Sequence, residues 1–204
     1  MILLQPTYFS PIIQYVAIVK SKEIIFEVED NFQKQTYRNR CLIYTANGKH
    51  LLNVPIQHRK DLKQKTKDVK IDYKDDWHKL HLKTLQTAYS SSPYFEFYID
   101  DLRPIFEKRI PFLLDLNLKC NEFVLDALQL QIPISKTVEY LKEPKYSDAR
   151  NLANAKSEHV FKLEKYFQVF NANHGFISNL SILDLIFMEG PNALNYLETQ
   201  TVNF

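Results

Sequence analysis

The chain has 204 residues and a formal net charge of +2, with 45% hydrophobic and 25% charged residues. This ordinary globular composition excludes a largely disordered chain, and the small charge argues against a general nucleic-acid or membrane-surface binder, which usually carries a marked basic excess. The length predicts a single domain over residues 1–204, with a helical C-terminal subdomain from about residue 134 as an alternative.

The first elements expected along the chain are a strand, a helix and a second strand. The apolar run before Pro6 predicts a buried strand that leads into a loop. Over residues 12–21 the apolar side chains recur with a spacing closer to that of a helix than to strict alternation. Residues 23–28 are rich in β-branched and aromatic side chains, which predicts a strand.

A β-hairpin is predicted over about residues 41–56. Two β-prone runs flank Asn47-Gly48, and this dipeptide supplies the positive φ angles that a tight hairpin turn needs. The lysine-rich stretch 59–70 predicts a solvated loop, followed by a short strand at 69–72. The alternatives for the lysine-rich stretch are closure over an anionic substrate or contact with RNA.

An amphipathic helix is predicted to begin at Asp76. Asp75 or Asp76 can cap it, and Pro93 ends it because a proline disfavours helical geometry in the residue before it. His81 lies near the middle of the apolar face of this helix and His78 lies towards its edge. The apolar stripe, spaced at about 3.6 residues per turn, comprises Trp77, Leu80, His81, Thr84, Leu85 and Ala88.

The second half of the chain is expected to be mainly helical. Helices are predicted at about 98–109 and 111–130, and the apolar pattern returns to helical spacing over 159–170 and 179–190. Between them, residues 134–157 favour a loop or a subdomain junction, because they are polar and interrupted by proline.

The last predicted helix carries signals at both ends. Ser181 and Asp184 have the spacing of a capping box, with Asp in the place usually taken by Glu or Gln, and Gly190-Pro191 would close the helix. Together the elements predict an α+β fold, with a small mixed or antiparallel sheet and a β-hairpin in the N-terminal half and a mainly helical C-terminal half.

Several kinds of site are absent from the sequence. Three glycines are too few for a Walker phosphate loop or a Rossmann fingerprint, and there is no G-x-S-x-G motif. The six histidines form no H-E-x-x-H or Cys/His zinc pattern, so no metal site is predicted. Cys41 and Cys120 lie far apart without a partner motif, which argues against a disulfide framework. No cofactor is identified.

The N-terminus lacks the basic region of a signal peptide, and prolines interrupt its apolar character. No apolar run approaches the roughly 20 residues of a membrane span. We therefore expect a cytoplasmic protein without membrane insertion.

The stretch "NFQKQTYRNR", residues 31–40, is cationic and its only neighbouring carboxylates precede it. If it is extended, Lys34, Arg38 and Arg40 point to one side, where they could hold phosphate or carboxylate. This predicts an anionic small-molecule substrate such as a nucleotide sugar, whereas a nucleic acid is not expected. The alternative is a solvated edge strand or loop whose cations pair with nearby carboxylates. Those carboxylates are Glu27, Glu29 and Asp30.

Two further side chains have both a chemical and a packing interpretation. His81 beside Trp77 could have a tuned pKa and act as a general acid or base, or it could be a core histidine that hydrogen-bonds the backbone. Cys41 next to Arg40 could be an activated thiolate, or a small buried strand residue.

Five segments in the same order resemble the WbqC-like family, in the form associated with Bacteroidetes. They are "QPTYFSPIIQYVAIV", "QKQTYRNRCLI", "LNVPI", "DDWHKLHLKTLQTAYSSSPYFEFY" and "GFISNLSILDLIFMEGP". The motif positions carried over are Gln5, Pro6, Tyr8, Gln33, Lys34, Asn39, Arg40, Pro55, Trp77, His81, Tyr89, Pro93, Tyr94 and Phe95. Many relatives read Y-[FL]-P-W after the opening Q-P, whereas this chain reads "YFSPII" and lacks that Trp, so a Trp stacked on a sugar is not assumed at this position.

The resemblance implies a role in the biosynthesis of O-antigen or another surface polysaccharide. It favours a transferase that moves an acyl or aminoacyl group onto the amine of an amino sugar, free or nucleotide-linked, with His81 taking the amine proton. The alternative is a non-catalytic protein that binds a nucleotide sugar or a glycan intermediate. The substrate-binding residues expected are Gln5, Tyr8, Gln33, Lys34, Arg38, Asn39, Arg40, Trp77 and Tyr94.

Overall fold

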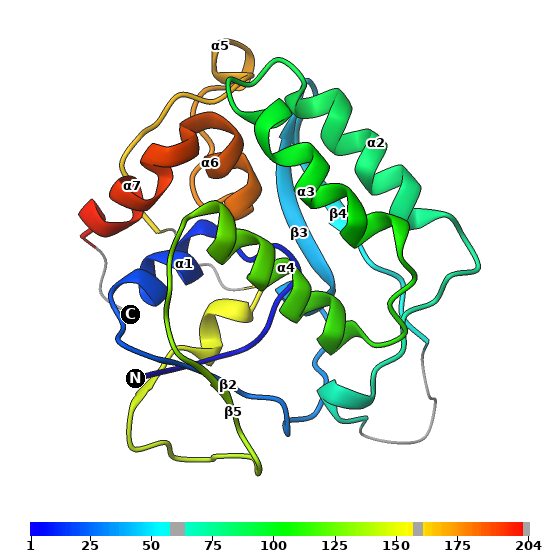
Figure 1. Ribbon diagram of the computed structural model, residues 1–204, viewed down its shortest axis with the longest axis vertical. Coiled ribbons are helices and arrows are strands. Elements are labelled where there is room, and N and C mark those ends of the chain that lie inside the picture. Colours follow the sequence, from blue (N-terminus) through cyan, green and yellow to red (C-terminus); the bar gives the residue numbers. More distant parts are fainter. Residues whose placement is uncertain (58–63, 157–160, 202–204) are drawn as a thin grey trace.

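The computed structural model describes residues 1–57, 64–156 and 161–201. Helices and strands are combined as an α+β fold requires, with a β-hairpin in the N-terminal half and a helical C-terminal half (Figure 1). The predicted fold class is therefore confirmed. The larger of its two sheets is parallel throughout, which the residue pattern did not specify.

The parallel sheet has four short strands in the order β5-β2-β1-β6. They are β1 (Ile2–Leu4), β2 (Ile24–Phe26), β5 (Ile134–Lys136) and β6 (Ser147–Asp148). The central strands β1 and β2 are apolar and buried at every position, as is usual when a parallel sheet is covered on both faces. Helix α1 (Ile12–Val19) connects them, because two parallel neighbours need a crossover.

The predicted hairpin is confirmed as β3 (Arg40–Thr45) and β4 (Gly48–Asn53), which pair antiparallel. At its turn the backbone takes a positive φ of 90° at Gly48. The glycine therefore supplies the left-handed conformation that the turn requires.

The remaining helices lie around these two sheets. They are α2 (Trp77–Tyr89), α3 (Phe95–Glu107), α4 (Leu113–Ala127), α5 (Asn171–His174), α6 (Ile182–Glu189) and α7 (Ala193–Thr199). Helix α3 packs against both α2 and α4, and α1 packs against α6 and α7 (Figure 1). Short 3₁₀ turns occur at Tyr37–Asn39, Thr66–Asp68, Arg150–Ala153 and Gly190–Asn192.

The residues predicted to begin and end α6, Ser181 and Gly190, do so in the structure. Ser181 caps its N-terminus by accepting a hydrogen bond from the Leu183 N–H at 3.3 Å, and Gly190 ends it with a φ of 50°. Asp184 does not complete a capping box. Its carboxylate is buried and accepts hydrogen bonds from Tyr89 and Tyr166, so it is turned into the core.

Other predictions need correction. Residues 161–168 are not helical, although they carry a helical apolar pattern. The expected strand at 69–72 is reduced to isolated bridges. On α2, Leu80 is 63% exposed and His78 is buried, so the buried face is rotated relative to the predicted stripe. Of the predicted loop 59–70, residues 59–63 lie outside the described part of the chain.

Within the described residues no helix is long and apolar enough to cross a bilayer. The same part of the chain contains no group of three or more His, Cys, Asp or Glu side chains placed to hold a metal ion.

Candidate substrate site at the carboxyl edge of the parallel sheet

A cavity of about 700 Å³ lies just beyond the carboxyl ends of the parallel strands. We call it the sheet-edge pocket. It is lined by Gln5 after β1, Asp30 after β2, Val138 after β5 and Arg150 after β6. Strand β1 has β2 as its neighbour on one side and β6 on the other. The pocket therefore lies at the point where the order of the strands reverses. Open α/β sheets bind ligands at such switch points.

Asp30 is the centre of a buried hydrogen-bond network in this pocket. Its Oδ2 accepts from Nε2 of Gln5 at 3.0 Å and pairs with Nη2 of Arg38 at 2.5 Å. Its Oδ1 accepts from the Thr66 hydroxyl at 2.6 Å. Burial lowers the pKa of the Arg38 guanidinium, and the charge of Asp30 acts in the opposite direction. The network fixes three segments that are distant in sequence.

Local contacts explain how Gln5 and Arg38 reach this place. The Gln5 carbonyl accepts a hydrogen bond from Nε2 of Gln14 on α1 at 3.0 Å. Asn117 on α4 donates through Nδ2 to the carbonyls of Pro6 at 3.1 Å and Arg38 at 2.8 Å. Helices α1 and α4 thereby hold the two backbone segments that carry Gln5 and Arg38.

A second buried carboxylate positions the other wall of the pocket. Glu27 accepts from the Thr137 hydroxyl at 2.9 Å and lies 3.4 Å from Nη1 of Arg150. Arg150 also pairs with Asp148 at 2.6 Å, and its guanidinium lies over the Tyr140 ring, 5.2 Å from the centroid. Tyr140 is 53% exposed, so its ring is available to a ligand.

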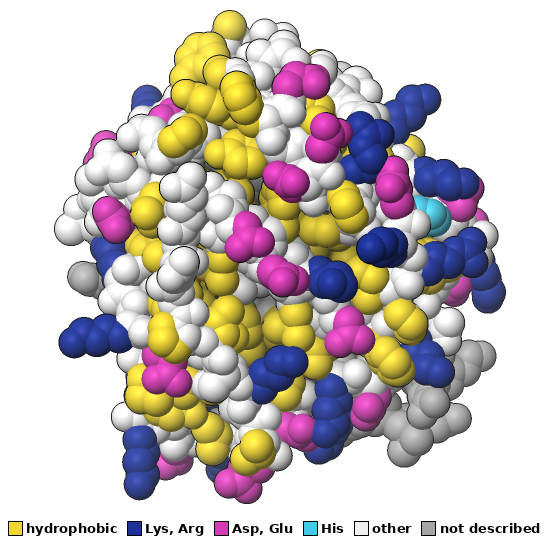
Figure 2. Space-filling view, in the orientation of Figure 1, with side chains coloured by type: hydrophobic (Ala, Val, Ile, Leu, Met, Phe, Trp, Pro, Cys, Tyr) yellow, Lys and Arg dark blue, Asp and Glu magenta, His cyan; other side chains and the backbone are white. Residues whose placement is uncertain are grey.

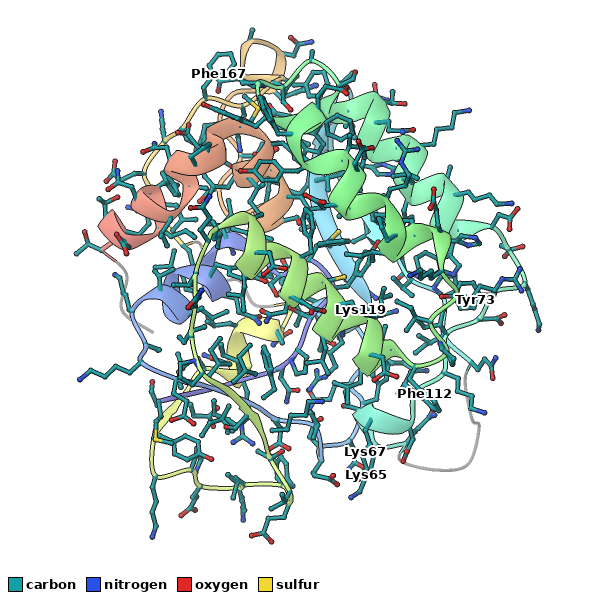
Figure 3. All side chains as sticks on the ribbon, in the orientation of Figure 1. Lys65, Lys67, Tyr73, Phe112, Lys119 and Phe167 are labelled. Atoms are coloured by element: carbon teal, nitrogen blue, oxygen red, sulfur yellow. The ribbon has the colours of Figure 1, made fainter. Side chains whose placement is uncertain are left out.

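The lysines at the pocket are also paired. Lys65 and Lys67 converge on Glu29 at 2.6 and 2.5 Å, and they lie close together at the lower end of the molecule in Figure 3. Their hydrogen bonds, that of Lys65 first, lower the pKa of Glu29. The cations that line the pocket within the described part of the chain, Arg38, Lys65 and Arg150, are therefore already neutralised by carboxylates.

Two buried polar atoms next to the pocket lack a hydrogen-bond partner within the described residues. They are Oε1 of Gln5 and Nε of Arg38. Each such atom costs roughly 1–3 kcal/mol of desolvation, and proteins retain few of them away from functional sites. Both atoms belong to side chains that line the pocket, where a polar ligand or a water molecule would supply the missing partner.

The segment 31–40 is not extended, which corrects the predicted row of three cations. The backbone reverses at Gln35, where φ is 60°, and a 3₁₀ turn follows at Tyr37–Asn39. Arg38 consequently points inward to Asp30, whereas Lys34 is exposed and is not among the residues lining the pocket.

His81 belongs to a different cluster, formed with Tyr8 and Trp77. Its Nδ1 lies 2.9 Å from the Tyr8 hydroxyl, and its ring centroid lies 5.1 Å from that of Trp77. Burial lowers the pKa of His81 to about 4, although a hydrogen bond with the Asn53 backbone opposes the shift. The ring is thus neutral at pH 7, and its Nδ1 is hydrogen-bonded with the Tyr8 hydroxyl.

The structure divides the predicted site residues into three groups. Gln5, Gln33 and Arg38 line the sheet-edge pocket, and Tyr8, Trp77 and His81 form the second cluster. The rest lie elsewhere. Asn39 donates to the Val54 carbonyl, Arg40 begins β3, Tyr94 packs against Gly190, and Lys34 is exposed.

Some pocket residues were not proposed from the sequence. Asp30 was considered only as a neutralising neighbour, although it follows a predicted strand, where functional residues of parallel sheets are found. Arg150 and Tyr140 belong to a region predicted as loop, and no motif marked them.

The sequence model of the WbqC-like protein family matches residues 5–163. The chain belongs to this family. The match contains every lining residue of the sheet-edge pocket, from Gln5 to Asn154. This WbqC-like chain is also 27% identical, over 202 residues, to the uncharacterized protein Rv1507c of Mycobacterium tuberculosis, with 86% of this chain and 87% of the relative covered. No solved structure matches it.

Proposed function

We propose that this chain binds an amino sugar in the sheet-edge pocket and acts as an acyl- or aminoacyl-transferase in the biosynthesis of O-antigen or another surface polysaccharide. The amino sugar is free or linked to a nucleotide diphosphate. Membership of the WbqC-like family supports the pathway, and the pocket supports the substrate.

The observation that carries the proposal is the convergence of polar side chains from all four strand ends on one cavity. Amides, paired charges and the exposed Tyr140 ring surround it. Such a lining suits a ligand with many hydroxyl and amine groups and one apolar ring face. Because the lining cations among the described residues are neutralised, these residues favour the sugar over the phosphates of a nucleotide-linked substrate.

In the proposed transfer, the amine nitrogen forms a bond to the acyl carbon, the bond between that carbon and its carrier breaks, and the amine loses a proton. Holding the amine against the donor lowers the barrier mainly through proximity and orientation. His81, the proton acceptor expected from the sequence, does not line the sheet-edge pocket and has a low pKa, so the proton of the amine is proposed to leave with the carrier of the acyl group.

Calorimetric titration with a nucleotide-linked amino sugar tests the binding step. We expect Gln5→Leu to weaken binding by about tenfold or more, since it removes a buried polar group at the pocket. Lys83→Glu, at an exposed position of α2, is the matched control. Equal affinities of the two variants, or a normal surface glycan in a deletion strain, would contradict the proposal.

The second candidate is a non-catalytic binder of the same ligand. It is favoured by the position of His81, which is buried against Tyr8 and is not among the residues lining the pocket. Incubation of the wild-type protein with the amino sugar and an acyl donor separates the two candidates. An enzyme forms the heavier acylated sugar, seen by mass spectrometry, whereas a binder retains ligand affinity and forms no product.

A further inference from the structure

A second hollow, about 1120 Å³ in volume, lies between α4 and β5. We call it the α4–β5 groove. Its apolar lining includes Phe26, Ile110, Leu118, Leu125, Ile132 and Ile134. Hydrophobic side chains are visible at the surface on this face of the molecule, bordered by charged ones (Figure 2). The volume exceeds that of the usual small-molecule pocket, so an extended ligand is needed to fill it.

Four cations also line the groove, and they come from three separate elements. Lys108 and Arg109 precede α4, Lys119 lies on α4 at the centre of the face shown in Figure 3, and Lys136 ends β5. In contrast to the cations of the sheet-edge pocket, none of these four has an ion-pair partner in the described ranges 1–57, 64–156 and 161–201.

The groove also contains acceptors and donors of other kinds. The carboxylates of Asp115, Glu122 and Asp126 line it along α4, so its formal lining charge is 4 − 3 = +1. Asn121 on α4 accepts from the Tyr15 hydroxyl at 3.1 Å through Oδ1, which leaves its N–H groups for a ligand carbonyl. The lining therefore fits an amphipathic ligand that carries amides and phosphates on an otherwise apolar arm.

The groove ends beside the sheet-edge pocket. Phe26 and Lys136 are register partners and the last residues of β2 and β5. Glu29 and Val138, three and two residues further along, line the pocket. At about 3.3 Å per extended residue, the two cavities are roughly 7–10 Å apart along the chain. A ligand lying in the groove can therefore present its end to the pocket.

We propose that the α4–β5 groove holds an acyl-coenzyme A donor. The phosphates contact Lys108, Arg109 and Lys119, the pantetheine arm covers the apolar floor, and the thioester reaches the end of the sheet near Lys136. The inference rests on the proposed transferase function. The amine of the bound sugar attacks the thioester carbon, a C–N bond forms, the C–S bond breaks, and coenzyme A leaves as the thiol with the proton that the amine loses.

Calorimetry with acetyl-coenzyme A on the full chain tests the site. We expect Lys119→Glu and Ile134→Glu each to weaken binding by about tenfold or more, and we expect Lys83→Glu to leave it unchanged. Pantetheine, which lacks the phosphates, should bind at least about tenfold more weakly, and binding of acetyl-coenzyme A should weaken with salt. Ile134 is 44% exposed on an edge strand, so its variant should fold, and a melting curve checks this.

Several results would overturn the inference. They are an absence of acetyl-coenzyme A binding, affinity that the two groove substitutions leave unchanged, and equal affinity for pantetheine. Binding of fatty acid or anionic lipid vesicles instead of acetyl-coenzyme A would also overturn it and would assign the groove to a lipid. The amino-sugar titration with Gln5→Leu is independent. If the sugar binds in the pocket while acetyl-coenzyme A does not bind, the groove assignment fails and the pocket assignment remains.

Discussion

Asp30→Asn should destabilise the protein strongly, because it removes the carboxylate that forms an ion pair with buried Arg38. The two side chains are 5% and 3% exposed, and the pair is 2.5 Å long. Removing one partner of a buried ion pair costs about 3–5 kcal/mol, since the other charge is left uncompensated. For a chain of 204 residues each kcal/mol lowers Tm by about 2–4 °C. The expected fall in Tm is therefore about 6–20 °C.

The assay is thermal and urea unfolding at pH 7, followed by circular dichroism. The double variant Asp30→Asn/Arg38→Met is the matched control. It removes both charges, so it should lose less stability than Asp30→Asn alone. A fall in Tm of less than about 3 °C for Asp30→Asn would refute the reasoning, because Asp30 would then contribute no more than an exposed carboxylate. A double variant less stable than the single one would contradict it as well.

Three further predictions concern stability. The pKa of His81 is about 4 in the folded state against an ordinary 6.5, so the unfolded chain binds a proton at this ring more readily than the folded protein does. The free energy of unfolding is therefore unaffected by this group above pH 6.5 and falls as the pH drops from 6.5 towards 4. Urea unfolding at several pH values should show a loss of about 3 kcal/mol over this range. In His81→Asn the free energy of unfolding should change less between pH 6.5 and 4. Gly190→Ala should lower the free energy of unfolding by about 2–5 kcal/mol, because both its positive φ and a Cβ placed 2.5 Å from the Tyr94 ring are unfavourable. Gly175→Ala should lower it less, because Gly175 has a positive φ but open space around it. Equal losses in the two variants would contradict this. Tyr166→Phe should cost about 1–3 kcal/mol in urea unfolding by removing a buried hydrogen bond to Asp184, and a neutral result would contradict that role.

The elements that could be predicted from the sequence are those set by a turn or capping residue close by in the chain. The hairpin follows from Asn47-Gly48, and the start of α6 follows from Ser181. The parallel sheet could not be predicted in this way, because β5 has three residues and β6 has two, and all five are exposed. Such strands carry no apolar periodicity. Their pairing depends on β1 and β2, which lie more than one hundred residues earlier in the sequence.

Tertiary contacts overrode local pattern at two further places. The apolar spacing over residues 161–170 indicates a helix, but the Tyr166 and Gln168 side chains hydrogen-bond to buried Asp184, and this segment remains non-helical. The alternation in residues 31–40 predicts a cationic face, but the pairing of Arg38 with Asp30 turns it inward. In both cases a buried carboxylate accepts hydrogen bonds from the segment and favours the observed path over the one that the local pattern predicts.

The candidate site was predicted only in part, because some of its residues are brought together by strand pairing that no local pattern indicates. Gln5, Gln33 and Arg38 were proposed from the sequence, and the structure brings them to one pocket. Arg150 and Tyr140 reach the same pocket only because β6 and the segment after β5 join the sheet. Without the strand order, the sequence pattern therefore predicts pocket residues from the N-terminal part of the chain and misses those near β5 and β6.

The pairing of β1 with β6 has a consequence for synthesis of the protein. The hairpin ends at Asn53, whereas β6 ends at Asp148, so 148 − 53 = 95 residues separate the completion of the two sheets. At roughly 5–20 residues per second, the ribosome needs about 5–20 s for that interval. During this time the apolar strands β1 and β2 lack one or both of their outer neighbours. A chaperone that binds nascent chains should therefore be retained until the segment around residue 150 has emerged, and the pocket should form in the same step that releases it.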